Sequence, residues 1–491
     1  MHASRRNFLM GAAAPLFAGL AAAVVTPETV RAMAAMQVSA DWALATADLE
    51  ADVAPRAMRL VHGRAPAGLT GTLFRNGPGK FRRPGGSATH WFDGDGLMRA
   101  FRVNDGQVTL DARFADTPKR RWETEIDAVV TPGFGTAGDA RARIGSNDDA
   151  NAANTAVMTA GDEVWALWEA GAPVAMSASD LSTKRFVTLR DDLRSMPFQA
   201  HPRYDPDGTI WNIGLNGDKA VVWHLNADRS LNAASVIDLP RASYMHDFTA
   251  TARHLILVLQ PWVFDQRGMP YASQFAWRPE LGTQVLVIDK ADLSRRRIFE
   301  LPTFSYFHLG DAWEDATGTI RFDVAAGKDV AFAVEGARVL VEQRGVVPGE
   351  PAVLKLITLH TDGRAELASS GVTAEFPKSD PRRAGLPRRL TVHVAGERPD
   401  RPLPTGLATW DWDSGRADSF TFGNTQIVEE AVFVPRGPDE AAAWLIAPSI
   451  NLAEGVTELH AFDAARVADG PVATWRADVA LPAGFHGVWA G

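Results

Sequence analysis

Short runs of alternating apolar and polar residues dominate the chain from about residue 55 onward. Clear examples of such runs are 71–75, 163–168, 209–213 and 254–259. Sequences typical of hairpin turns lie between runs of this kind, at 104–106, 205–208 and 361–363. Because helical periodicity is nearly absent after residue 50, the pattern predicts an all-β fold.

Many short strands at regular spacing are compatible with a sandwich, a barrel or a propeller. The length favours the propeller: roughly 455 residues divided among seven blades leaves about 65 for each, enough for four strands and their loops. No repeat of the WD or kelch type is present, so the sequence does not give the number of blades directly. We expect one domain, residues 35–491, folded as a seven-bladed β-propeller.

The first 34 residues have the features of an export signal. A twin arginine, Arg5-Arg6, precedes a run rich in Ala, Leu, Phe and Val that ends at Val25. Residues 32–34 (Ala-Met-Ala) supply a small-x-small cleavage site. The pattern indicates a twin-arginine signal, residues 1–34, that is cleaved on export to the periplasm. An ordinary secretory signal and a retained membrane anchor stay open, although the apolar run is shorter than the roughly 20 residues of a spanning helix.

Charge and cysteine content exclude several classes of function. The formal net charge is −9, and the scattered basic residues cannot neutralise a phosphate backbone, so we expect no nucleic-acid partner. The sequence contains no cysteine, which excludes disulfides, thiolate metal sites and thiol catalysis. After the signal, no segment is long and apolar enough to span a membrane.

Four of the 12 histidines stand in contexts that set them apart from the others. They are His201 before Pro, His246 before Asp-Phe, His308 after Tyr-Phe, and His486 before Gly. Their intervals are too wide for a local metal motif, but they are compatible with inner strands of four blades that converge on one axis. Spacing alone leaves open that they are ordinary polar residues, which is our interpretation of His62, His224, His254, His360, His393 and His460.

Several motifs occur in an order that resembles the carotenoid cleavage oxygenase family, which includes lignostilbene dioxygenases and the retinoid isomerohydrolase. Residues 71–78 (Gly-Thr-Leu-Phe-Arg-Asn-Gly-Pro) and 90–96 (His-Trp-Phe-Asp-Gly-Asp-Gly) are similar to its N-terminal signature, and 201–206, 246–248 and 486–489 to its metal-ligand segments. The resemblance covers essentially everything after residue 55. His90 belongs to the signature, and we expect it to be structural. The ligands of one metal ion on the propeller axis are implied to be His201, His246, His308 and His486.

The same resemblance implies three glutamates behind the ligands: Glu169, Glu375 and Glu430. Each is expected to accept the outer ring N–H of one histidine, which fixes the tautomer and aims the other nitrogen at the metal. Because Glu430 follows Glu429, the register leaves both open. After the third histidine the chain has Asp311 where the family pattern has Asn, which puts the hydrogen bonding there in question.

Four neutral imidazoles suit a first-row divalent metal, and an octahedral ion with four histidines keeps two positions for dioxygen and for water or substrate. Zinc, which is usually tetrahedral, would have no open position. With no thiolate or haem ligand, we expect one non-haem iron(II), Fe(2+), per subunit. The resemblance implies a dioxygenase that cleaves one conjugated C=C bond to two carbonyl products, a reaction that needs no catalytic triad.

The substrate is expected to be an apolar polyene or a stilbene-like molecule, with O2 as the second substrate. In the resemblance, lignostilbene-type members have a Tyr and a Lys that engage a phenolic hydroxyl. Here Phe114 stands where that Tyr would lie, near Lys119. Phenylalanine cannot hydrogen-bond a phenol, which favours a carotenoid or apocarotenoid over a stilbene. Two other classes stay open: a non-catalytic, metal-containing propeller binding protein and a non-oxidative isomerohydrolase.

Loops are expected to cap the propeller and form an apolar tunnel to the metal. Segment 262–281 is rich in aromatic residues. It is interpreted either as a tunnel mouth in peripheral contact with a membrane or as a packed loop. For the precursor, the expected partner is the twin-arginine translocase.

Overall fold

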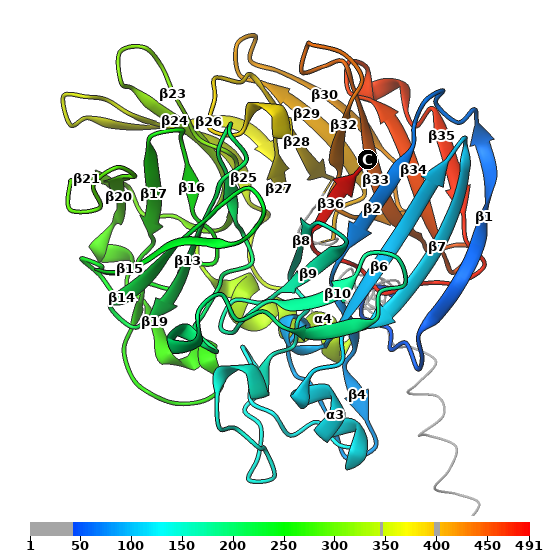
Figure 1. Ribbon diagram of the computed structural model, residues 1–491. Helices are drawn as coiled ribbons and strands as arrows, with labels where there is room; N and C mark the ends of the chain where they lie inside the picture. The colour runs from blue at the N-terminus through cyan, green and yellow to red at the C-terminus, as the bar shows by residue number, and fades with distance from the viewer. Residues whose placement is uncertain (1–42, 344–346, 397–402) are drawn as a thin grey trace, which may run out of the picture.

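The structure, a computed structural model, describes residues 43–343, 347–396 and 403–491. The predicted signal, residues 1–34, therefore lies outside the described residues. Antiparallel strands make up most of the described chain, and their sheets follow one another around a ring (Figure 1). The all-β, propeller-like architecture predicted from the sequence is confirmed.

Five sheets of four or five strands follow one another along the middle of the chain. The first contains β8 (Ala156–Ala160), β9 (Glu163–Leu167), β10 (Val174–Ser177) and β11 (Thr183–Phe186). The second contains β12 (Arg203–Tyr204), β13 (Ile210–Asn216), β14 (Lys219–Leu225) and β15 (Leu231–Asp238). The third contains β16 (Thr249–Ala250), β17 (His254–Leu259), β20 (Thr283–Asp289) and β21 (Arg296–Leu301).

The fourth sheet contains β22 (Ser305–Leu309), β23 (Trp313–Glu314), β24 (Ile320–Gly327), β25 (Val353–Leu359) and β26 (Ala365–Thr373). The fifth contains β27 (Glu375–Lys378), β28 (Leu390–Ala395), β29 (Gly406–Asp411) and β30 (Arg416–Thr421). In each of the five sheets, the strand that comes first in the chain lies at one edge of the strand order.

Both ends of the described chain contribute to a single eleven-stranded sheet. Its early strands are β1 (Val53–Gly63), β2 (Gly71–Arg75), β3 (Pro78–Lys80), β6 (Asp95–Asn104) and β7 (Gln107–Phe114). Its late strands are β31 (Gln426–Val428), β32 (Val432–Pro435), β33 (Ala443–Asn451), β34 (Val456–Asp463), β35 (Ala473–Arg476) and β36 (Gly487–Ala490). The pairing of β1 with β35 joins the two groups, and β36 adds to the edge of β2. The blue and red strands therefore meet in Figure 1.

Apolar side chains fill the spaces between neighbouring sheets. One buried cluster joins Met158 and Trp165 of the first sheet to Ile210 and Trp223 of the second. Similar clusters lie between the second and third sheets and between the third and fourth. Burying each such side chain contributes about 1.5–3 kcal/mol. This face-to-face packing of successive sheets is what makes the arrangement propeller-like.

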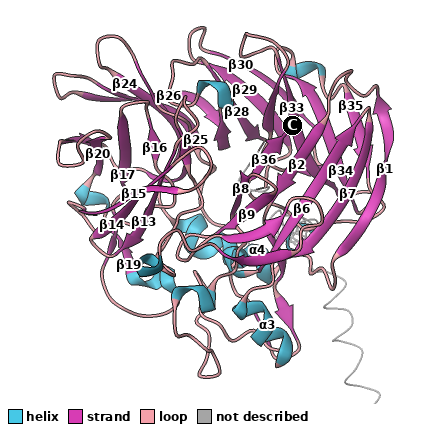
Figure 2. Ribbon diagram, in the orientation of Figure 1, coloured by secondary structure: helices cyan, strands magenta, loops and turns pink. Residues whose placement is uncertain are grey.

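Helices are few and short, and several lie together near the lower part of the ring (Figure 2). They include α3 (Pro118–Glu125), a π-helical turn (Phe332–Gly336) and α4 (Ala337–Glu342). A two-stranded hairpin, β18 (Trp262–Phe264) with β19 (Phe275–Trp277), and the short pair β4 (Arg82–Arg83) with β5 (Gly86–Ser87) complete the strands. No helix in the described part of the chain is long and apolar enough to cross a membrane.

The predicted runs and turns fall where the pattern placed them. Runs 71–75 and 254–259 coincide with β2 and β17, and turns 205–208 and 361–363 separate paired strands. The turn between β6 and β7 has Asp105 at φ +47° and Gly106 at φ +78°. Two successive positive φ angles match the right-handed twist of a hairpin, and Gly adopts them at no steric cost.

We expect Gly106→Ala to destabilise the protein by about 1–2 kcal/mol, because an L-residue is strained at this φ. The added Cβ would also lie 2.9 Å from the Cβ of Ala65. The measurement is the free energy of unfolding in urea, with Gly268→Ala as the control, since its Cβ meets no atom closer than 4.0 Å. Equal stability of the two variants would contradict the assigned turn.

Candidate metal centre

Each of the four predicted histidines lies on or beside a strand at the inner edge of its sheet. His308 is in β22, His201 and His246 shortly precede β12 and β16, and His486 directly precedes β36. All four strands end the strand order of their sheets. Four different sheets therefore each bring one imidazole to the centre of the ring.

The four side chains are buried and close together. One ring nitrogen from each histidine can be chosen so that all four lie within 4.8 Å of one another. The Nε2 atoms of His201 and His246 are 3.1 Å apart, and the ring centroids of His201 and His486 are 4.5 Å apart. Nitrogens bound at about 2.1 Å on adjacent corners of an octahedron lie about 3.0 Å apart. The spacing therefore fits a shared metal ion.

Three of the histidines have a glutamate behind them. Glu375 Oε2 is 2.5 Å from His308 Nδ1, and Glu430 Oε1 is 2.8 Å from His486 Nδ1. Glu169 contacts Nδ1 of His246. A carboxylate on Nδ1 keeps the proton on that nitrogen and leaves Nε2 with its lone pair free. Consistent with this, Nε2 of His308 is buried without a hydrogen-bond partner among the described residues.

Of the two adjacent glutamates, Glu429 and Glu430, it is Glu430 that contacts His486. Its side chain is fully buried; besides contacting His486, it accepts a hydrogen bond from the Gly487 N–H at 2.8 Å. Glu429 instead accepts from the Gly484 N–H at 2.9 Å, so it holds the backbone just before the histidine. Both acids therefore fix the last ligand segment, by different contacts.

Burial controls the protonation of the imidazoles. It lowers the pKa of His486 to about 3, although Glu430 opposes the shift. Burial and the neighbouring imidazoles hold the pKa of His201 well below its ordinary value. Burial also acts on His246, but Glu169 outweighs it and raises the pKa of this residue. His201 and His486 are therefore neutral near pH 7, as a metal ligand must be.

Two residues that contribute to the site were missed in the sequence. The Tyr244 hydroxyl donates to both oxygens of Glu169, at 3.0 and 3.2 Å. Phe376 stacks on His308 with ring centroids 4.7 Å apart and has φ +52°. A bulky residue at this φ is strained, and such strain is found at functional sites. The tyrosine two residues before His246 offered a weak signal, whereas the backbone of Phe376 had none.

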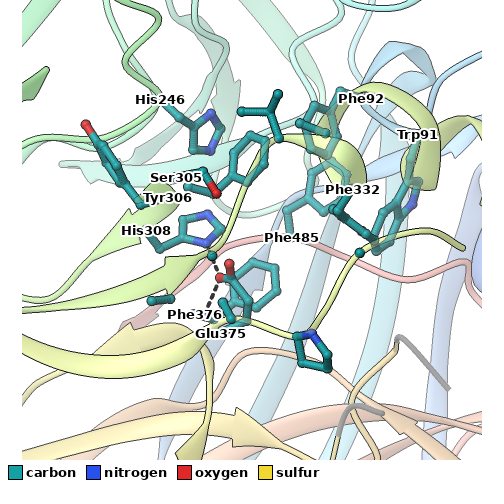
Figure 3. Close-up of a pocket in the computed structure, with 18 of the residues that line it drawn as sticks. Trp91, Phe92, His246, Ser305, Tyr306, His308, Phe332, Glu375, Phe376 and Phe485 are labelled. Atoms are coloured by element: carbon teal, nitrogen blue, oxygen red, sulfur yellow. Dashed lines mark hydrogen bonds and ion pairs between the residues drawn. The ribbon is translucent and has the colours of Figure 1, made fainter. Parts of the chain in front are cut away.

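Three of the histidines open onto a cavity of about 180 Å³ whose other lining residues are mostly apolar, many of them aromatic. Figure 3 shows His246 and His308 on one side and Phe92, Phe332 and Phe485 across from them. His486, Glu169 and Glu375 also line the cavity, whereas His201 and Glu430 do not. Polar metal ligands on one side and apolar rings on the others suit a reaction on an apolar molecule.

The stretch that was aligned with a phenol-binding pair lies away from this cavity. Phe114 is buried in the core cluster of the eleven-stranded sheet. Lys119 is buried in an ion cluster, 2.8 Å from Asp95 and 3.0 Å from Glu123. Neither residue lines the cavity, so the phenylalanine at this position says nothing about the substrate.

His90 has the structural role expected for it. Its Nε2 lies 2.7 Å from the Ala333 carbonyl, and its Nδ1 accepts a hydrogen bond from the Phe92 N–H at 3.2 Å. Both ring nitrogens are thus occupied, and the residue is outside the four-histidine group. It ties the N-terminal signature to the helical turn beside the cavity.

Segment 262–281 is packed at one side and exposed at the other. Trp262 is buried and lines the cavity, as a packed element would. At the outer side of the same segment, Phe264 and Met269 are 39% and 56% exposed. The segment therefore forms part of the cavity wall and also presents apolar groups to the surroundings.

Comparison with known proteins places the chain in a family. The profile of the retinal pigment epithelial membrane protein family matches residues 46–491. This match covers nearly the whole chain, and the protein therefore belongs to that family, the carotenoid cleavage oxygenases. The resemblance drawn from the motifs is confirmed.

Three curated relatives have similar identities. They are isoeugenol monooxygenase of Pseudomonas putida (27% identical, covering 87% of this chain and 93% of the relative), lignostilbene-alpha,beta-dioxygenase isozyme III of Sphingomonas paucimobilis (26%, 88% and 93%) and apocarotenoid-15,15'-oxygenase of Synechocystis (26%, 88% and 92%). Among solved structures, a variant of the Synechocystis apocarotenoid oxygenase superposes with a TM-score of 0.83 at 22% identity, covering 92% of this chain and 98% of that one. A cobalt-substituted form gives 0.82 at 24% identity with the same coverage. The structural likeness shows the shared fold.

We expect Glu375→Gln to weaken metal binding about 10–100-fold, because the amide is a poorer acceptor for the His308 N–H and no longer enforces the tautomer. Competition with a chelator for iron(II) measures the loss. Glu366→Gln, at an exposed surface glutamate, is the matched control. Unchanged affinity of both variants would remove Glu375 from the site.

Proposed function

We propose that His201, His246, His308 and His486 hold one iron(II) ion and that the protein is a dioxygenase. The observation that carries the proposal is the group of four buried imidazoles, three of them backed by carboxylates, beside an apolar cavity. The buried, unpaired Nε2 of His308 supports a metal partner. Four imidazoles with no thiolate suit iron better than zinc, whose usual four positions they would fill.

The proposed reaction is the cleavage of one conjugated C=C bond by O2. The double bond breaks, each of its carbons gains one atom of the O2 molecule, and two carbonyl compounds are formed, so no other reductant is needed. When bound, iron(II) supplies the activation of dioxygen. The carboxylates keep the Nδ1 protons in place, and the aromatic walls hold the alkene and exclude water. Removal of water protects a reactive oxygen species from side reactions.

We propose a carotenoid or apocarotenoid as the substrate class. The cavity wall is rich in Phe and Trp, which suits a hydrocarbon chain. No lysine occurs among the described lining residues. The tyrosine in that set, Tyr306, donates its hydroxyl to the carbonyls of Asp247 and Val258 at 3.0 and 2.7 Å. Its hydroxyl proton is therefore engaged and is not available to donate to a phenol.

A stilbene or another phenolic alkene is the second candidate. Asp329 and Glu350 line the same cavity, and a carboxylate can accept a hydrogen bond from a phenol. Relatives named for isoeugenol and lignostilbene have the same level of identity as the one named for an apocarotenoid. A panel containing both substrate classes separates the two candidates.

We further propose that the eleven-stranded sheet represents two blades joined edge to edge, which makes seven in all. In its strand order, β31, β33, β34 and β35 form one group of four, and β1, β7, β6 and β2 form another. Four of the other five sheets likewise have four strands. The pairing of β1 with β35 would then be the closure between the last blade and the first.

The reaction is tested with iron-loaded protein, O2 labelled with oxygen-18, and a panel of apocarotenoids and stilbenes. We expect one labelled oxygen atom in each of two carbonyl products, and His308→Ala to lose turnover and most of its iron. Products that carry oxygen only from water would indicate an isomerohydrolase. A protein with no iron and no turnover would be a binding protein of the same fold.

We propose that the precursor is exported to the periplasm by the twin-arginine translocase. The support is the Arg5-Arg6 pair before an apolar run and the small residues at 32–34. The mature chain would start near residue 35, and the exposed Phe264 and Met269 would make peripheral contact with a membrane that carries a lipophilic substrate.

We expect Arg5→Lys with Arg6→Lys to leave full-length precursor in the cytoplasm, because a receptor distinguishes the guanidinium groups from amines of the same charge. Cell fractionation and the mass of the mature N-terminus are the measurements. The uncut chain in the cytoplasm of cells that make the unaltered protein would contradict the export pathway. It would leave the metal centre unaffected.

A further inference from the structure

Three of the four histidine segments meet at one buried ion cluster behind the metal centre. Its centre is Arg203, two residues after His201, whose side chain is only 13% exposed. The guanidinium donates to both oxygens of Asp247, at 2.6 and 2.8 Å, and to Asp311 at 2.8 Å. Asp247 follows His246 directly. The side chain of Arg203 therefore connects the segment of His201 to the segment of His246.

The same guanidinium also holds the backbone of both neighbouring segments. Its Nε donates to the Phe248 carbonyl at 2.6 Å, and its Nη2 donates to the Leu309 carbonyl at 3.1 Å. Leu309 is the residue after His308, and its own N–H donates to Asp247 at 2.8 Å. Arg203 and Asp247 therefore connect three inner edge segments from three different sheets.

Asp311 extends the cluster to a fourth sheet. Its side chain accepts from the Ser379 hydroxyl, one residue beyond the strand that begins with Glu375. Its carbonyl accepts from Arg388 at 2.9 and 2.7 Å. The aspartate that departs from the family pattern is thus the second carboxylate of the Arg203 cluster, and its negative charge faces a buried guanidinium.

The cluster also bears on His201. Among the described residues, no carboxylate hydrogen-bonds to this histidine, unlike the other three. Its ring orientation therefore depends on packing against the other three imidazoles and on its backbone, which Arg203 anchors two residues away. A planar guanidinium fixes the directions of its five N–H groups, which a lysine ammonium does not.

We propose that Arg203, Asp247 and Asp311 form a positioning clamp that sets the spacing of His201, His246 and His308 and thereby the affinity for the metal. None of the three residues belongs to the four-histidine group or lines the cavity. The inference rests on the proposed iron site. It assigns to Asp311 the role of an ionic clamp partner, where an asparagine would give only a neutral hydrogen bond.

The test compares Arg203→Lys and Asp311→Asn with the unaltered protein and with Arg321→Lys. The control removes a guanidinium from a more exposed ion pair of similar length, Arg321 with Asp315 at 2.7 Å. The measurements are the affinity for iron(II) and cobalt(II) by chelator competition, the electron paramagnetic resonance spectrum of the nitric oxide adduct, kcat and KM, and the Tm of metal-free protein.

We expect Arg203→Lys to bind both metals about 10–100-fold more weakly, the range found for residues that orient metal ligands. Asp311→Asn keeps an acceptor oxygen, so it should fold and lose less affinity than Arg203→Lys. Both should change the resonance spectrum and lower kcat more than they raise KM, and Arg321→Lys should do neither.

Either clamp variant with a lower Tm but unaltered metal affinity and spectrum would show a purely structural role and overturn the clamp. If Arg203→Lys does not fold, Asp311→Asn decides between the two outcomes. If the unaltered protein binds neither metal, the iron site itself is refuted. Metal binding by the unaltered protein therefore distinguishes failure of the clamp from failure of the iron site.

Discussion

Closure of the ring is the constraint on which the metal centre depends. β1 pairs with β35, and β36 pairs with β2, so segments from both ends of the described chain form one sheet. This pairing joins the last group of strands to the first and covers edges that would otherwise be open to other chains. Only in the closed ring do the inner edges of four sheets face one another. The ring of His486, on the segment beside β36, then lies 4.5 Å from that of His201.

Burial at the centre of the ring has two opposed effects on the imidazoles. A metal ligand must be neutral with an exposed lone pair, and burial favours the neutral imidazole. A buried N–H, however, needs an acceptor, and the glutamates behind three of the rings provide it. Segments at the inner edges of the sheets thus supply the polar half of the site. The apolar half comes partly from the same strands, with Phe307 and Phe376, and partly from the connections, with Phe92 and Phe332, so the ligands and the cavity wall share part of the fold.

The sequence was sufficient where the signal was local or carried by a motif. Alternation and turn residues located β2 and β17 because a strand's side-chain pattern depends on a few neighbouring residues. The motifs picked out the histidines that lie together and the glutamates behind them. The substrate argument from Phe114 was wrong because β7 directs that side chain into the core between sheets, which no local pattern reveals. Neither the positive φ of Phe376 nor the partners of Arg203 were predictable, since both depend on contacts between segments distant in sequence.

The distribution of the four ligands over four sheets affects how the protein matures. Bringing distant segments together costs loop-closure entropy, and such long-range contacts tend to form slowly. A partly folded chain, in which some of the four segments are still apart, therefore lacks part of the ligand set. The complete set of nitrogens exists only in the finished ring. The iron(II) ion that we propose for this site would thereby be kept out of immature molecules, in which it would oxidise exposed side chains among the 11 methionines of the chain. Late assembly of the centre would thus protect the chain against the chemistry that we propose for it.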